Sequence, residues 1–405
     1  MEPMTPRGAR LRARTPRRNT VRRWCIPPAI LREPDETLEG TGILEEHRGE
    51  SGLLLWHSLR DVTLWAAVSP EERAALFAPP AAAERLRLLR AAGVEPTLEV
   101  SLTTLAALVG NPSGASAEIV TLVCLQVSRW AQGRGAPNTT LAFAQAGALA
   151  SPEDASAALA VGVLALHFRR LPRAETWLRR TIGLARRKRD WASYAQAWVE
   201  LGRLYTRRGS ADFARRALIK GLRASRRHGL LSIRATALHG LFLLTMETGD
   251  FDDAERLARL AMRAYGRGSA RQPELQHDLA RLWVHRGTYE RALPALQKLL
   301  PTRVNPDERV LTLALLARAA AGVGNRPLYQ EMWWDAWTLV ERGGDDETLA
   351  RALLQMAHAS ALLRDAPRLD QACRHALRGP LRNAEPRVLD EVETLASTLR
   401  APAAR

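Results

Sequence analysis

The stretch that decides the fold is WVELGRLY at residues 198–205. Its larger side chains, Trp198, Leu201 and Tyr205, are spaced i, i+3 and i+7, so an α-helix brings them to one face, which we predict to be buried. Small residues then follow at Gly209, Ala214 and Gly221, where they allow a second helix to approach the first closely. The stretch therefore predicts a helical hairpin.

The same layout recurs along the chain, with a small residue in the first turn of each second helix. Ala174, Ala214, Ala254 and Ala292 are separated by 40, 40 and 38 residues, and Ala372 lies 80 residues beyond Ala292. A fixed period of this length is typical of a stacked repeat array.

The best copy resembles the tetratricopeptide repeat, because residues 198–205 carry the family's W-x2-L-G-x2-Y run and Gly209 its turn glycine. The resemblance covers residues 116–384 and implies an all-α, right-handed superhelical α-solenoid of about six tetratricopeptide-like hairpins. The period near 40 exceeds the usual period of about 34, so each helix should be most of a turn longer.

Other copies match this pattern less well. Gly249 and Gly287 keep the turn, and so does Gly324, after which either Tyr329 or Met332 replaces the small residue. These departures leave the register of the weaker copies open.

Four regions are predicted. Residues 1–45 combine arginines with proline and glycine and read as a basic disordered tail and linker. Residues 46–115 form an N-terminal helical region and residues 116–384 the repeat array. Residues 385–405 supply the capping helix that such arrays need, followed by a short tail.

Helix boundaries outside the repeats follow from local signals. Ser69–Glu72 and Ser151–Asp154 both read as helix starts, the first as a capping box with proline at the first helical position. Residues 81–92 should form a helix and residues 111–116 a loop.

The net charge of +16 comes almost entirely from arginine, since the chain has 59 basic residues of which only Lys188, Lys220 and Lys298 are lysine. This usage suggests GC-rich coding as much as a chosen partner. Residues 1–23 contribute +7 of the charge. Such a tail could bind nucleic acid with a salt-dependent, sequence-blind affinity, but a solvated tail is favoured and nucleic acid is an unlikely partner elsewhere.

The chemistry-bearing residues do not form a recognisable active site. The three cysteines lie far apart and the nine histidines are scattered, so we expect no metal, cofactor or disulfide. Phosphate-binding, nucleophile-elbow and metalloprotease motifs are lacking, which argues against an enzyme. Since no segment approaches the length of a membrane span and no signal peptide follows the basic start, we expect a cytoplasmic protein without membrane contact.

The resemblance implies a ligand-binding groove on the inner face, lined by the first helix of each hairpin. When each copy is aligned on its turn glycine, a set of cationic side chains falls at groove positions, and arginine in such a set accepts carboxylates in a bidentate manner. Solvated side chains in an arginine-rich chain are the alternative. The set comprises Arg203, Arg207, His239, His277, Arg281, His285 and Arg318.

The densest aromatic feature lies in the copy whose turn glycine is Gly324. Tyr329, Trp333 and Trp337 share one helical face and are predicted to be core residues, whereas Trp334 points elsewhere and is a candidate exposed contact.

These features predict a scaffold that binds a protein or peptide, with an acidic segment as the favoured ligand. The alternative is a regulatory sensor domain that responds to a peptide or small ligand and acts through a transcriptional or signalling partner.

Overall fold

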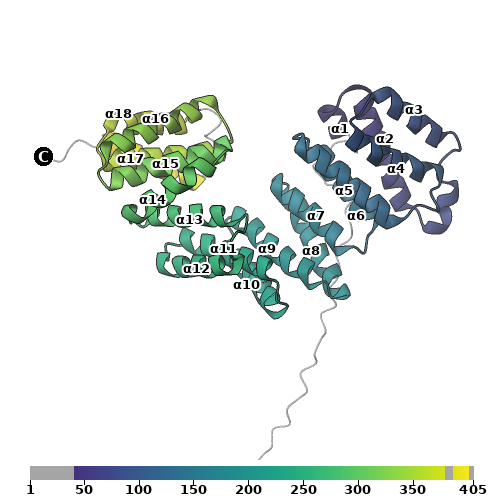
Figure 1. Cartoon of the computed structure of the whole chain (residues 1–405), viewed down its shortest axis with the longest axis horizontal. Helices are drawn as coiled ribbons and strands as arrows, with labels where there is room; N and C mark the ends of the chain where they lie inside the picture. Colours follow the sequence, from purple (N-terminus) through teal and green to yellow (C-terminus); the bar gives the residue numbers. More distant parts are fainter. Residues whose placement is uncertain (1–40, 379–385, 401–405) are drawn as a thin grey trace, which may run out of the picture.

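A computed structural model describes residues 41–378 and 386–400, and helices are the only regular elements in these ranges (Figure 1). The N-terminal region contains α1 (Thr41–Glu46), α2 (Gly49–Ala67), the short 3-10 helix η1 (Pro70–Ala75), α3 (Ala81–Ala92) and α4 (Pro96–Gly110). The predicted helix at 81–92 and loop at 111–116 are confirmed.

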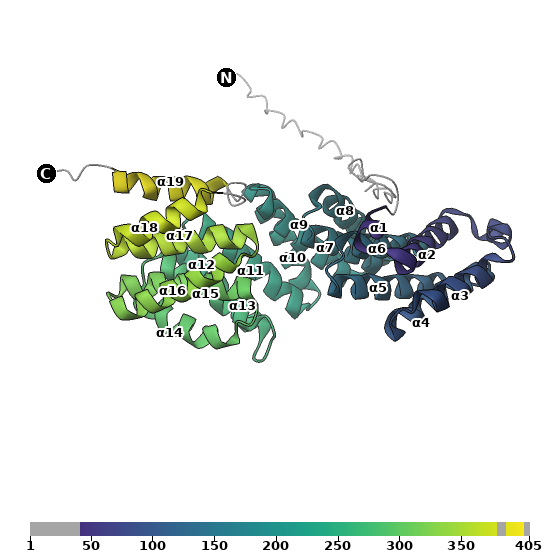
Figure 2. The same cartoon turned by 90° about the horizontal axis from the view of Figure 1, so that it is seen from above.

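Seven antiparallel helix pairs follow, one more than the approximate number predicted. They are α5/α6 (Ala117–Gly133, Pro137–Ala150), α7/α8 (Ala155–His167, Leu171–Lys188), α9/α10 (Trp191–Arg207, Ala211–Arg227), α11/α12 (Leu231–Glu247, Phe251–Tyr265), α13/α14 (Gln272–His285, Tyr289–Leu299), α15/α16 (Pro306–Gly322, Arg326–Arg342) and α17/α18 (Asp346–Leu362, Ala366–Ala376). A 3-10 turn, η2 (Leu300–Thr302), extends α14. The chain is an α-solenoid of tetratricopeptide-like hairpins, as predicted (Figure 2).

The hairpins bend at a residue in the left-handed region of backbone space. Gly209 has φ 70° and Gly249 φ 79°, and the arginines Arg169 and Arg364 hold the same place with φ 60° and 56°. Glycine adopts this region without steric cost. The left-handed turn therefore marks the same position in each hairpin, even where the residue at that position is not glycine.

Five residues after each turn comes the position equivalent to Ala214 of the best copy. Ala174, Ala214, Ala254 and Ala292 occupy it in four hairpins and are fully buried. In the last two hairpins the position belongs to residues 329 and 369, a tyrosine and a leucine. The equivalence assigned to Ala372 is therefore wrong by three residues, and the choice between residues 329 and 332 falls on 329.

The best copy explains why its small residues matter. A Cβ atom on Gly202 would lie 2.5 Å from Cγ of Leu218, and one on Gly221 would lie 2.7 Å from Cγ2 of Val199. The predicted apolar stripe is only partly buried, since Leu201 is enclosed whereas Trp198 and Tyr205 are half-buried.

Of the two predicted helix starts, the first is in place and the second is displaced. Ser69 is the N-cap residue of η1, whose first residue is Pro70, although its hydroxyl bonds to the Glu72 carboxylate at 2.9 Å and caps no backbone amide. Ser151 ends α6, where its hydroxyl is engaged by Thr121 and Ala117. The N-cap of α7 is Asp154, which accepts from the amide of Ser156 at 2.8 Å.

Both ends of the array are capped. Residues 41–45, predicted as linker, belong to α1, where Ile43 is buried; the rest of the predicted tail, like residues 379–385 and 401–405, lies outside the described residues. At the other end, α19 (Pro386–Arg400) packs on α17 and α18 and buries Val388 and Val392 in their shared core. This matches the predicted capping helix. No helix in the described ranges has the length and apolarity to cross a bilayer.

Candidate functional site

The first helices of the hairpins form the inner face of the solenoid. Consecutive first helices contact one another from α7 through α17, whereas no comparable contact joins consecutive second helices. The first helices therefore lie on the inside of the curve, and the second helices form the outer face. All seven predicted groove residues lie on the first helices α9, α11, α13 and α15.

Two of the predicted cations on the inner face already have carboxylate partners. Arg203 lies 3.2 Å from the carboxylate of Glu200, which also receives a hydrogen bond from Gln196. Arg281 lies 3.4 Å from the carboxylate of Asp278. The local charge of each arginine is thus balanced within its own helix.

A hydrogen-bonded group links α11 to α13. The buried ring of His239 bonds through Nε2 to Asp278 at 2.9 Å and through Nδ1 to the hydroxyl of Tyr265 at 3.4 Å. Burial opposes ionisation of Asp278, but Arg281 and the bond from His239 outweigh it and lower the pKa of this carboxyl. The group holds an ionised carboxylate beneath the inner surface.

The other two predicted histidines contribute no positive charge at neutral pH. Burial lowers the pKa of His277 to about 4. His285 is exposed; partial burial of its ring and the nearby cations Arg318 and Arg281 lower its pKa. The predicted set is therefore less cationic than its composition suggests, and its positive charge rests on the arginines.

Arg207 and Arg318 differ from the other two arginines because neither forms an ion pair with any of the described residues. Arg207 donates to the carbonyl of Leu166 at 2.6 Å, and Arg318 donates to the side-chain oxygen of Gln355 at 2.8 Å. Both guanidinium groups keep further N–H donors, since arginine has five. The pKa of each guanidinium group is lowered, mainly by burial. These are the inner-face positions best suited to receive an external carboxylate.

A further hydrogen bond joins α17, the first helix of the last hairpin, to the C-terminal capping helix. His358, which occupies the α17 position equivalent to Arg318, bonds to Glu391 of α19 at 2.7 Å. At the opposite edge, Arg169 pairs with Glu347 at the start of α17. This pair joins the second hairpin of the array to the seventh. We did not predict either contact, because both join segments whose proximity depends on the curvature.

The aromatic residues of α16 divide as predicted. Tyr329, Trp333 and Trp337 are buried, and the hydroxyl of Tyr329 bonds to Ser360 at 3.0 Å. Trp334 is 59% exposed, which makes it accessible to a partner.

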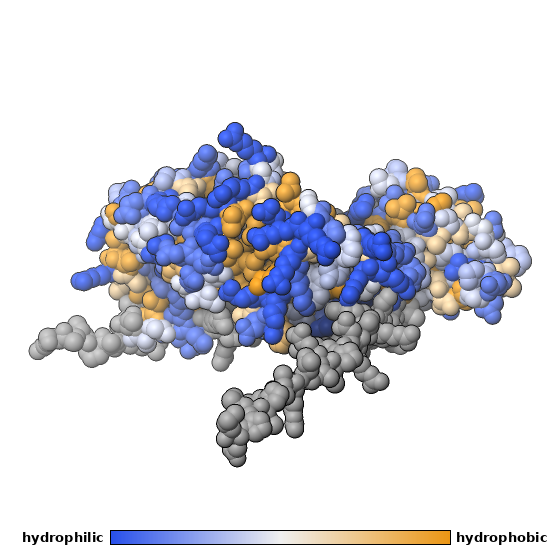
Figure 3. Space-filling model, turned by 90° about the horizontal axis from the view of Figure 1, so that it is seen from below, coloured by the Kyte–Doolittle hydropathy of each residue, from blue (hydrophilic) through white to orange (hydrophobic). Residues whose placement is uncertain are grey.

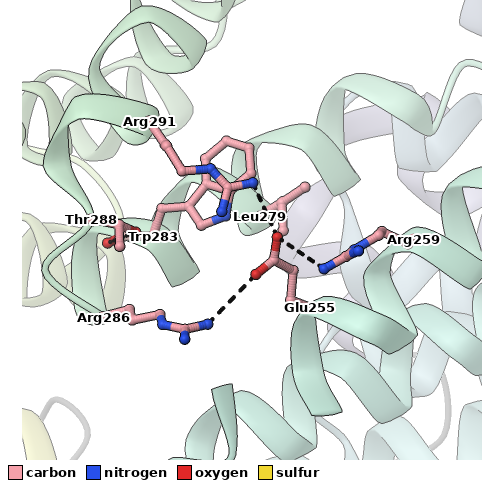
Figure 4. Close-up of a pocket in the computed structure, with 7 residues that line it drawn as sticks. All are labelled: Glu255, Arg259, Leu279, Trp283, Arg286, Thr288 and Arg291. Atoms are coloured by element: carbon pink, nitrogen blue, oxygen red, sulfur yellow. Dashed lines mark hydrogen bonds and ion pairs between the residues drawn. The ribbon is translucent and has the colours of Figure 1, made fainter. Parts of the chain in front are cut away.

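A cavity of about 520 Å³ lies between hairpins α11/α12 and α13/α14 (Figure 4). Three arginines surround one carboxylate there: Glu255 lies 3.2 Å from Arg291, 3.4 Å from Arg259 and 3.6 Å from Arg286. The indole of Trp283 packs 4.6 Å from the Arg291 guanidinium, and its N–H has no partner. We did not predict this cluster, although a glutamate four residues before an arginine and an arginine before a turn glycine are visible in the sequence.

The thiols and acidic groups indicate no further site. Cys124 and Cys373 are buried, and burial raises their pKa to about 12 and about 11, so both are protonated and unreactive at neutral pH. In the described ranges, no group of three histidine, cysteine or carboxylate side chains is arranged to hold a metal ion.

Comparison with known proteins finds similarity at the level of the fold. No protein-family model and no curated protein matches the sequence. Among solved structures, a Rap protein complexed with Competence and Sporulation Factor has 11% identity and TM-score 0.47, covering 86% of this chain and 99% of its own. BtubC from P. vanneervenii has 18% identity and TM-score 0.42 (56% and 92% covered), and PilF of Pseudomonas aeruginosa 15% and 0.44 (56% and 95%).

Proposed function

We propose that this protein is a scaffold that binds a protein or peptide segment along its inner face, with an acidic side chain or a C-terminal carboxylate as the anchoring group. The proposal rests on Arg207 and Arg318, two inner-face arginines that have no carboxylate partner among residues 41–378 and 386–400. Arg318 is half-buried and Arg207 is exposed, and both keep N–H donors that can receive a carboxylate in a bidentate manner.

The paired arginines support this assignment by contrast. Glu200 and Asp278 already occupy the positions that a ligand carboxylate would take at Arg203 and Arg281. A ligand would have to displace these internal partners, and that exchange gains little. We therefore assign the anchoring role to Arg207 and Arg318. The neighbouring hydrogen-bonded group of His239 and Asp278 would orient the ligand.

Selection from a random nonapeptide library displayed on phage tests the proposal. Wild-type protein should enrich peptides with aspartate, glutamate or a free C-terminus, and the R207Q/R318Q variant should bind them at least tenfold more weakly. The R203Q/R281Q variant serves as the matched control and should lose less affinity. Enrichment of peptides without carboxylates, or equal affinity in all three proteins, would contradict the proposal. Circular dichroism verifies that each variant is folded.

A further inference from the structure

The outer face carries a second charged feature, which lies on α10. Six basic side chains of this helix are exposed, and Asp212 is its one acidic residue. We call this set the α10 stripe: Arg215, Arg216, Lys220, Arg223, Arg226 and Arg227.

The six residues share one face of the helix. At about 100° per residue they fall within a sector of about 140°, and from the first to the last they span about 18 Å along the axis. The buried residues Ala214, Leu218 and Gly221 fall on the opposite side. The stripe is thus a continuous ridge that points away from the core.

The stripe has no internal counter-charge. None of its six cations forms an ion pair within the described residues; Lys220 instead packs on Trp198 at 4.1 Å, and Arg216 on Phe213 at 4.6 Å. Basic residues in the last turn of a helix are stabilised by the helix dipole, which accounts for Arg226 and Arg227. It does not account for the cations in the earlier turns.

Arginine-rich composition alone does not explain this placement, because the other second helices differ. α10 has six basic residues and one acidic residue, and so does α8. By contrast, α12 has three of each, and α16 has two basic and three acidic residues. Although Arg173 and Arg180 of α8 are buried, its other four basic residues are exposed, so exposed positive charge is concentrated on two adjacent hairpins. Figure 3 shows the lower face of the molecule, on which long hydrophilic side chains surround an apolar patch.

The type of charge favours a nucleic acid over a membrane or an acidic protein. Membrane-surface helices place several large apolar side chains beside their cations, and Phe213 is the one exposed large hydrophobic residue within α8 and α10. A duplex presents a phosphate charge about every 1.7 Å along its axis, which suits a ridge of evenly spread guanidinium groups. An acidic protein offers fewer and less regular charges.

We infer that the α10 stripe, together with α8, binds the phosphodiester backbone of nucleic acid without sequence preference. This surface is separate from the inner-face groove, so a bound peptide and a bound nucleic acid would lie on opposite faces of the array.

Fluorescence anisotropy with a labelled random-sequence 30-base-pair DNA tests the inference in the full chain. The R215Q/R216Q/R223Q/R226Q variant should bind at least tenfold more weakly than wild type at low salt, with a shallower dependence of affinity on salt. The control R256Q/R263Q/R326Q/R342Q removes the same net charge from α12 and α16 and should bind nearly as wild type does. Equal losses in both variants would overturn the inference, since they would reflect net charge alone.

Parallel titrations identify the ligand class. Single-stranded RNA of the same length tests whether a duplex is needed, and either nucleic acid supports a phosphodiester ligand. Binding to phosphatidylserine vesicles without binding to DNA or RNA would overturn the inference, as would an absence of nucleic-acid binding at low salt.

Lysine acetylation followed by mass spectrometry gives a readout independent of the variants. The chain has three lysines, of which Lys188 ends α8, Lys220 lies in the stripe and Lys298 lies on α14. Bound DNA should protect Lys220 and Lys188 and leave Lys298 reactive. Protection of Lys298 alone, or of none, would contradict the assigned surface.

Discussion

The junctions around Glu175 and Glu255 are built from equivalent positions two hairpins apart, yet one is tight and the other open. In both, a glutamate six residues after the hairpin turn meets an arginine one helical turn later and another arginine just before the next turn. Glu175 accepts hydrogen bonds from Arg179 and Tyr205 at 2.8 Å each, and pairs with Arg208. At Glu255 the pairs lie between 3.2 and 3.6 Å, beside the cavity.

One side chain accounts for much of the difference. Tyr205 brings a hydroxyl to the Glu175 carboxylate, and its ring packs on Phe213 at 5.6 Å. The equivalent residue in the other junction is Trp283, whose indole N–H bonds to nothing and whose ring packs on Arg291. The two junctions thus have their charged residues at equivalent positions, while the aromatic residue determines how closely the adjacent hairpins pack.

Replacement of Glu175 by alanine should have the largest effect on stability. It leaves two arginines and a tyrosine hydroxyl without their acceptor, and we expect a loss of about 2–3 kcal/mol in the free energy of unfolding. Glu255→Ala should cost about 1 kcal/mol, because its longer contacts are weaker. Urea denaturation followed by circular dichroism measures both. A larger cost at Glu255 would show that the open junction is the stronger one.

The tight junction should also respond to pH. Although burial opposes it, the bonds from Tyr205, Arg179 and Arg208 lower the pKa of Glu175. A carboxyl with a lowered folded-state pKa stabilises the fold above its unfolded pKa of about 4.3, and this stabilisation is lost as the pH falls through the folded value.

The free energy of unfolding of wild type should therefore exceed that of Glu175→Gln by about 1.5 kcal/mol at pH 7. This difference should disappear as the solution is acidified below pH 4. Denaturation curves of both proteins across this range measure the gap. A gap that stays constant with pH would mean that the ionised carboxylate is not responsible.

Removal of the hydroxyl alone should have a moderate effect. Tyr205→Phe keeps the ring contact with Phe213 and deletes the hydrogen bond that the hydroxyl donates to Glu175 and the one it accepts from Arg179, so we expect a loss of about 1 kcal/mol. If stability is unchanged, the hydroxyl does not distinguish the two junctions, and the tightness must come from the arginines.

The smallest effect should come from Arg291→Gln in the open junction. Its side chain is 57% exposed, so loss of its pair with Glu255 and of its stacking on Trp283 should cost about 0.5 kcal/mol. A loss comparable to that of Tyr205→Phe would show that Arg291 replaces the missing hydroxyl.

Several elements were accessible from the sequence because their signals are local. The helix at 81–92, the cap beyond residue 385 and the core positions of Tyr329, Trp333 and Trp337 follow from periodicity and breakers over a few residues. The start of α7 was misplaced because Ser151 and Asp154 carry similar capping signals, and only the contacts of Ser151 with α5 decide between them.

The register error at Ala372 has a related cause. A constant period of 40 was extended from Ala292, but the turns at Gly287 and Gly324 are only 37 residues apart; the spacing of 40 returns between Gly324 and Arg364, which adopts the last left-handed turn instead of a glycine. Because an arginine at residue 364 does not indicate a left-handed turn, the register of this copy could be determined only from the backbone structure.

The sequence by itself determined the helices, their pairing into hairpins and their repetition, because glycine, alanine and apolar spacing act over one or two helical turns. Only the tertiary structure decided which arginines are paired and which are free. Arg203 and Arg207 look alike in the sequence, yet Arg203 meets Glu200 while Arg207 reaches the carbonyl of Leu166. The Arg203–Glu200 pair is local, three residues apart on α9, whereas Arg207 reaches Leu166 of α7 only because successive hairpins stack on one another.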